Sequence, residues 1–66
     1  MKYNINDVVE ILIDIPHENI KSGSVGVIVE LFDDQTDFFY EVEFCNSNGE
    51  TLTTISLNEK YIRKHF

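Results

Sequence analysis

The chain has 66 residues, of which 12 are acidic and five are basic, giving a formal net charge of −7. A chain of this length has enough apolar residues for one core only, so we expect residues 1–66 to form a single domain. Its acidity disfavours nucleic acid and anionic membranes as partners. The single cysteine excludes an internal disulfide and favours a reducing compartment, and the N-terminal residues fit neither a signal peptide nor a membrane span, so we expect a cytoplasmic protein.

The first half of the chain predicts two strands separated by a long loop. Residues 7–13 alternate with Val9, Ile11 and Ile13 on one side, and Pro16 ends this strand. Residues 14–22 are a polar loop with one apolar anchor, Ile20. Residues 24–32 predict the second strand, in which Gly26 marks a bulge or a sharp bend.

The second half predicts a hairpin whose register is set by its turn. Residues 33–37 form a turn or loop, and residues 38–45 and 51–56 are strands around Asn48-Gly49, which favours a type I′ turn. With Ser47 facing Glu50, one face becomes apolar through the pairs Phe44 with Thr53, Val42 with Ile55, and Tyr40 with Leu57.

A second register follows if Leu31 faces Tyr40. The inner face then pairs Val29 with Val42 and Val27 with Phe44, while the outer face places Glu30 directly opposite Glu41. Like charges in opposition destabilise a sheet.

Residues 57–60 predict a single helical turn and residues 61–64 a closing strand. The fold expected is therefore all-β, a small five-stranded SH3-like barrel with a long first loop and a one-turn helix before the last strand.

Several short segments carry a resemblance to a known family. They are Asp7-Val8-Val9, Asp14-Ile15-Pro16, Gly23-Ser24-Val25-Gly26, Ile28-Val29-Glu30, Tyr40-Glu41-Val42-Glu43-Phe44, Gly49 and Ile62-Arg63. The chain resembles the small bacterial family catalogued as domain of unknown function 4926, and the wider set of SH3-like barrels with a KOW-type glycine turn. The resemblance implies a stand-alone barrel without an established activity, paired with a companion protein of the toxin and antitoxin or immunity kind. Asn19-Ile20 stands where the family often has Gly-Leu, which bears on the choice of partner.

The residues do not assemble into a catalytic or metal-binding pattern. Cys45 lies close to Glu43, and a neighbouring carboxylate disfavours the thiolate that a nucleophile needs. His17 and His65 have no second ligand at zinc spacing. The acidic loop at residues 33–37 lacks the EF-hand pattern. We therefore expect no enzyme activity, no metal and no cofactor.

The outer sheet face is the candidate partner-binding site. Its expected residues are Ile28, Glu30, Glu41, Glu43, Leu52 and Thr54, with Phe39 as an anchor at the rim. Apolar positions among carboxylates suit a basic protein partner, so we expect a non-catalytic interaction module, in the form of an antitoxin, immunity factor or inhibitor of a nuclease. Phe32 and Phe39 also have a purely structural interpretation, which is as well supported as a role in binding. In it, the two rings cover the open end of the barrel or pack on Phe66.

Two other functions stay open. By analogy with KOW-type barrels, Lys60, Arg63 and Lys64 could contact RNA or the ribosome. Alternatively the domain is a structural subunit of a larger enzyme. A homodimer formed through an open edge strand is compatible with each of these.

Overall fold

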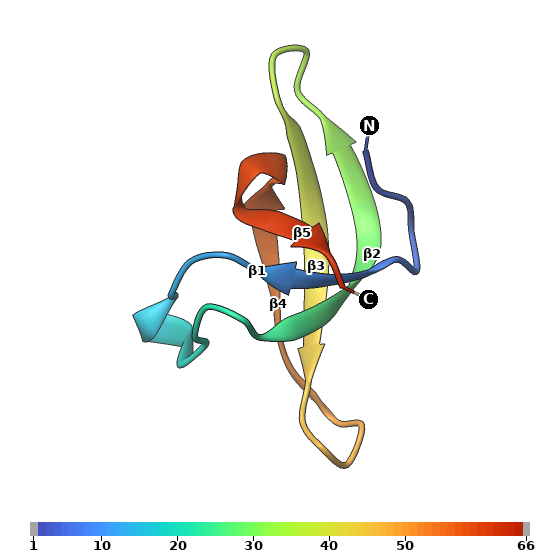
Figure 1. The fold of residues 1–66 in the computed structure, drawn as a ribbon. Helices are drawn as coiled ribbons and strands as arrows, with labels where there is room; N and C mark the ends of the chain where they lie inside the picture. The colour runs from blue at the N-terminus through green and yellow to red at the C-terminus, as the bar shows by residue number, and fades with distance from the viewer. Residues whose placement is uncertain (1, 66) are drawn as a thin grey trace.

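Five antiparallel strands form a single sheet in the computed structural model, which describes residues 2–65 (Figure 1). The elements in chain order are β1 (Val8–Ile11), the 3-10 turn η1 (Pro16–Glu18), β2 (Val25–Asp33), β3 (Phe38–Cys45), β4 (Thr51–Asn58), the 3-10 turn η2 (Glu59–Tyr61) and β5 (Ile62–Lys64). The strand order is β4-β3-β2-β1-β5, and β1 and β5 cross in front of β3 and β4 in Figure 1.

The predicted all-β class is confirmed. The long first loop and the single turn before the last strand are also present, although the turn begins at Glu59 because Leu57 and Asn58 continue β4. The sheet stays open, with β4 and β5 as its two edges. No helix within residues 2–65 is long and apolar enough to cross a membrane.

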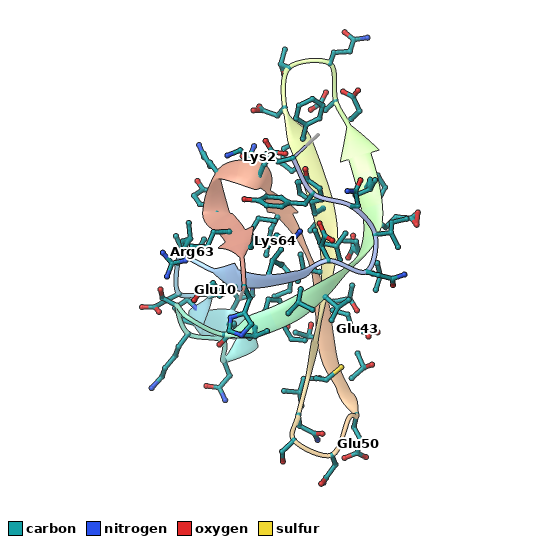
Figure 2. All side chains as sticks on the ribbon, turned by 45° about the vertical axis from the view of Figure 1, so that its right-hand side comes forward. Lys2, Glu10, Glu43, Glu50, Arg63 and Lys64 are labelled. Carbon is teal, nitrogen blue, oxygen red and sulfur yellow. The ribbon has the colours of Figure 1, made fainter. Side chains whose placement is uncertain are left out.

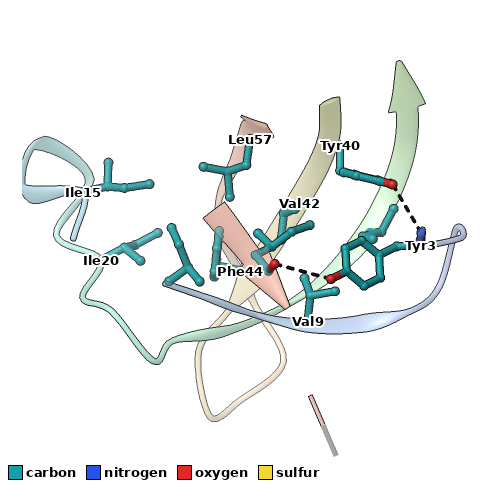
Figure 3. Packing of buried hydrophobic residues seen from close by; sticks show 11 residues of the cluster. Tyr3, Val9, Ile15, Ile20, Tyr40, Val42, Phe44 and Leu57 are labelled. Atoms are coloured by element: carbon teal, nitrogen blue, oxygen red, sulfur yellow. Dashed lines mark hydrogen bonds between the residues drawn. The ribbon is translucent and has the colours of Figure 1, made fainter. Parts of the chain in front are cut away.

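The core lies between the two crossed parts of the sheet (Figure 3). Its most buried side chains are Val9, Ile11, Ile28, Tyr40 and Val42. Ile15 and Ile20 pair with each other across η1 and are both buried, so the long loop is anchored at its base as the apolar character of Ile20 predicted.

The predicted register of β3 with β4 is confirmed from Phe44 inward. The pairs are Tyr40 with Leu57, Val42 with Ile55, and Phe44 with Thr53. The predicted type I′ turn is wrong, because only Gly49 has a positive φ, of 82°, and Asn48 does not. Asn46 closes the turn instead: its carbonyl accepts from the Gly49 N–H and its side-chain oxygen accepts from the N–H groups of Asn48 and Glu50. A bulge after Phe44 then sets Cys45 opposite Thr51.

The predicted register of β2 with β3 is confirmed at one end and wrong at the other. Leu31 lies opposite Tyr40 and Glu30 opposite Glu41, but a bulge between Ile28 and Glu30 shifts the pairing. Ile28 therefore faces Val42, while Val27 faces Glu43 on the outside. The bulge thus lies at Val29 and not at Gly26.

Gly26 has a different role, which is to let β2 approach β3 closely. A Cβ atom at this position would lie 2.6 Å from Cγ1 of Val42 and 2.9 Å from the carbonyl oxygen of Glu43. Because no side chain fits there, the tight crossing of the two strands depends on glycine.

Candidate partner-binding face

The outward-facing side chains of β2, β3 and β4 form one continuous surface. Three cross-strand rows build it: Phe32 with Phe39 and Asn58, then Glu30 with Glu41 and Ser56, then Val27 with Glu43 and Thr54. We use the name acidic face for the set Val27, Val29, Glu30, Phe32, Phe39, Glu41, Glu43 and Thr54.

The predicted opposition of Glu30 and Glu41 is present at the centre of the acidic face. Neither carboxylate has a salt-bridge partner among residues 2–65, where the two salt bridges are Arg63 with Glu10 and Lys64 with Asp7. Two paired residues of an antiparallel sheet have Cα atoms about 5 Å apart, so the two negative charges repel each other with no internal compensation. A cation supplied from outside would relieve this repulsion.

Glu43 continues the acidic face toward the β3–β4 turn. One carboxylate oxygen accepts a hydrogen bond from the hydroxyl of Thr51 at 3.2 Å, and the other lies 3.8 Å from the sulfur of Cys45. The thiol of Cys45 is exposed. These contacts hold the Glu43 carboxylate along the sheet surface, one row away from Glu41.

The prediction that Ile28 belongs to this face is wrong. Ile28 is fully buried, because the bulge at Val29 turns it toward Val42 in the core. Val29 is 36% exposed and takes the outward position instead. In a run where valine and isoleucine alternate closely, no feature of the sequence marks which of them a bulge will turn outward.

Leu52 lies at the far end of the surface. It has no Cα partner in β3, because the bulge places both Thr51 and Leu52 against Cys45, and it is 63% exposed. Phe32 is 45% exposed and pairs with the half-buried Phe39, so the aromatic row is open to solvent on β2. The predicted contact of these rings with Phe66 lies outside the described residues.

A family model described as Domain of unknown function (DUF4926) matches residues 5–64. The chain belongs to the DUF4926 family. No curated protein and no protein of solved structure gives a significant match to it.

The basic cluster of this DUF4926 domain is engaged within the fold. The guanidinium Nε of Arg63 lies 2.8 Å from a Glu10 carboxylate oxygen, and the Lys64 ammonium lies 3.8 Å from Asp7 (Figure 2). The ammonium of Lys60 sits 5.1 Å from the centre of the Tyr61 ring. The acidic neighbours reduce the positive potential that a phosphate backbone would need.

A second polar cluster, which sequence reasoning missed, joins the N-terminal segment to η2. The hydroxyl of Tyr40 donates to the Glu59 carboxylate, which also accepts from the backbone N–H of Lys2 at 3.1 Å. Burial, followed by the bond to Glu59, raises the pKa of Tyr40, whereas the bond from Tyr40 lowers the pKa of Glu59. The phenol is therefore held protonated. The cluster connects the N-terminal segment, β3 and η2, which are far apart in sequence.

One shallow pocket of about 230 Å³ lies in the long first loop of the DUF4926 domain, lined by Asp14, Pro16, Asn19, Ile20 and Lys21. The Asp14 carboxylate is already used, because it accepts from the N–H of Ser22 at 2.8 Å. Across the part of the chain that the structure describes, no three His, Cys, Asp or Glu side chains converge to hold a metal ion.

Proposed function

We propose that this DUF4926 domain is a non-catalytic interaction module that binds a basic protein surface through its acidic face. The observation that carries the proposal is the direct opposition of Glu30 and Glu41, neither of which forms a salt bridge within the described residues. A small domain has little stability to spare, and a like-charge pair lowers it by roughly 0.2–1 kcal/mol. Binding of a Lys or Arg from a partner would offset that loss.

The apolar positions of the face favour a protein partner over a small cation. Val29 and Phe32 are 36% and 45% exposed, and both belong to the strand that carries Glu30. Exposed ion pairs contribute only about 0–1 kcal/mol each, so affinity has to come mainly from apolar contact. The carboxylates then act chiefly on the rate of association and on the choice of partner.

The partner class that fits this chemistry best is a nucleic-acid enzyme such as a nuclease. Such a protein presents clustered Lys and Arg side chains for phosphate, and an acidic sheet face can occupy them in place of the nucleic acid. The domain would then act in the bacterial cytoplasm as an antitoxin, immunity factor or inhibitor. Direct nucleic-acid or ribosome binding has less support, because Arg63 and Lys64 are paired with acidic neighbours. No observation singles out a role as subunit of a larger enzyme.

The test is capture of partners from the native cell, followed by binding kinetics with the purified partner. The variant Glu30→Lys/Glu41→Lys/Glu43→Lys reverses the acidic face. The matched control Asp34→Lys/Asp37→Lys/Glu50→Lys changes the net charge by the same amount at exposed turn positions. We expect a basic protein that the parent and the control retain and the face variant loses, with a slower and less salt-dependent association rate for the face variant.

Two results would contradict the proposal. Equal loss of binding in the control and the face variant would show that total charge, and not this face, determines association. Unchanged kinetics in the face variant would remove the acidic face as the binding site.

A further inference from the structure

The two edges of the sheet are protected very differently. At one edge, β5 is three residues long and carries Arg63 and Lys64, which both form salt bridges with neighbours on or next to β1. A short, charged edge strand resists pairing with another chain. At the other edge, β4 is eight residues long with the sequence Thr51-Leu52-Thr53-Thr54-Ile55-Ser56-Leu57-Asn58. It has no charged residue and no proline, although the chain as a whole carries 17 charged residues among 66.

The outer backbone of β4 is unpartnered within residues 2–65. β4 pairs only with β3, and none of the backbone hydrogen bonds outside the strand ladders involves Thr51–Asn58. Every second residue of an edge strand directs its N–H and C=O groups away from the sheet, where they form a template for one more strand. Glu18 reaches β4, but it accepts from the side-chain hydroxyl of Thr53 and leaves the backbone free.

We propose that the domain forms a homodimer in which β4 pairs antiparallel with β4 of a second copy, independently of any partner on the acidic face. The strand is self-complementary in this arrangement. Pairing centred on Thr54 places Thr54 opposite Thr54 of the partner and Leu52 opposite Ser56 of the partner. Cross-strand threonine pairs are favourable in sheets, and β4 itself brings no charged side chain to the interface. Leu52, at 63% the most exposed large apolar side chain among residues 2–65, then lies at the dimer interface.

The net charge of −7 does not prevent this contact at physiological salt. Glu41 and Glu43 lie on β3, one strand in from the edge, so the two acidic faces are separated by three strand spacings, or about 14 Å. That exceeds the Debye length of about 8 Å at physiological ionic strength. Lower salt lengthens the range of the repulsion, so the dimer should weaken as salt is removed. Binding of a basic partner to the acidic face changes with salt in the opposite direction.

The first experiment is sedimentation equilibrium over a concentration series, at low and at high salt. A strand-to-strand contact buries a small area, so the series has to extend to high protein concentration. We expect the apparent mass to rise from 7.7 kDa toward twice that value, and to rise further at high salt. Thr54→Lys should shift the protein to monomer, because two lysines would face each other, while Thr36→Lys adds the same charge in an exposed turn and should dimerise as the parent does.

Disulfide cross-linking tests the register directly. In a Cys45→Ser background, Thr54→Cys should cross-link under oxidation, because opposed residues of an antiparallel pair lie within disulfide reach. Thr36→Cys in the same background should stay monomeric under the same conditions. A constant mass of one chain at every concentration would overturn the proposal. Self-association that Thr54→Lys leaves unchanged, without cross-linking of Thr54→Cys, would place the contact elsewhere and overturn it equally.

Discussion

The hydroxyl of Tyr40 donates a hydrogen bond to the carboxylate of Glu59, which joins β3 to η2. The same two side chains hold the N-terminal segment, since Lys2 donates its backbone N–H to Glu59 and Tyr3 donates its own to the Tyr40 oxygen. The rings of Tyr3 and Tyr40 pack edge to face with centroids 5.5 Å apart (Figure 3). This contact connects the titration of Glu59 to the stability of the fold.

Replacing Glu59 by Gln should remove part of the acid sensitivity of folding. The folded-state pKa of Glu59 lies below its ordinary value of 4.5, so its stabilising contribution is complete above that value and is lost as pH falls through the folded pKa. At neutral pH we expect Glu59→Gln to lower the free energy of unfolding by no more than about 1 kcal/mol, because Glu59 is partly exposed. Urea unfolding from neutral to acidic pH measures both effects. The control is Asp37→Asn, and equal acid sensitivity of Glu59→Gln and the parent would argue against the contact.

Alanine at Gly26 should destabilise the protein through a steric clash. The added methyl group would meet both Val42 and the backbone oxygen of Glu43, and the backbone cannot move aside as a flexible side chain can. Overpacking of this kind costs roughly 1–3 kcal/mol. Gly49→Asn is the comparison, because Gly49 has open space around it and Asn tolerates a positive φ, so its cost should stay below about 1 kcal/mol. Urea unfolding of both variants measures the two losses of free energy of unfolding. A smaller loss for Gly26→Ala than for Gly49→Asn would contradict the close crossing of β2 and β3.

The bulge at Val29 predicts that truncation of two adjacent residues destabilises the protein to very different extents. Ile28→Ala removes a fully buried side chain and should cost about 2–5 kcal/mol. Val29→Ala shortens a side chain that is 36% exposed and should cost well under half as much. Chemical denaturation of the two variants measures the difference. A larger loss of stability for Val29→Ala than for Ile28→Ala would support the register without a bulge, in which Val29 lies in the core.

Lysine at position 30 should stabilise the protein while weakening its proposed function. Glu30→Lys converts an opposed pair of carboxylates into an opposed ion pair with Glu41, so a repulsion is removed and an attraction of similar size is gained, and we expect the free energy of unfolding to rise by roughly 0.4–2 kcal/mol. The gain should shrink in high salt. Asp34→Lys makes the same change of charge in an exposed turn and separates the local effect from reduced total repulsion. Thermal or urea unfolding measures the stability of both variants. An equal increase in both would show that the opposition of Glu30 and Glu41 does not itself destabilise the sheet.

Alternation in the sequence was enough to predict the sheet wherever each strand has one clearly apolar face. In β3, Tyr40, Val42 and Phe44 are apolar while Glu41 and Glu43 are not, so a slip by one residue would bury charge. The register with β4 was predicted from the turn at Asn48-Gly49, and this contrast is why it is correct from Phe44 inward although the turn has a different conformation. It places Glu41, Glu43 and Thr54 on the same surface. The opposition of Glu30 and Glu41 follows from the same pattern.

The same reasoning fails in the first part of β2, because both of its faces are aliphatic. Val27, Val29 and Ile28 all suit a core, so the pattern does not say which of them a bulge turns outward. The close approach of Gly26 to Val42 belongs to the observed register, and it depends on how the strands cross in three dimensions. The cluster of Lys2, Tyr40 and Glu59 was missed for a related reason, since it joins residues up to 57 positions apart and no local motif marks it.

The pairing of β1 with β5 also bears on the order in which the chain folds. Glu10 and Arg63 are 53 positions apart, whereas the β3–β4 hairpin is local, so closing the β1–β5 contact carries the larger loss of chain entropy. We expect the hairpin to be formed in the folding transition state and β5 to dock afterwards. Val42→Ala should therefore slow folding, while Ile62→Ala should mainly speed unfolding, as stopped-flow folding and unfolding rates would show. Should Ile62→Ala slow folding as much as Val42→Ala, β5 is already in place at the barrier. If β5 docks last, every incomplete molecule exposes β1 as its edge strand, and the last step of folding replaces that apolar edge by the short, charged edge of β5.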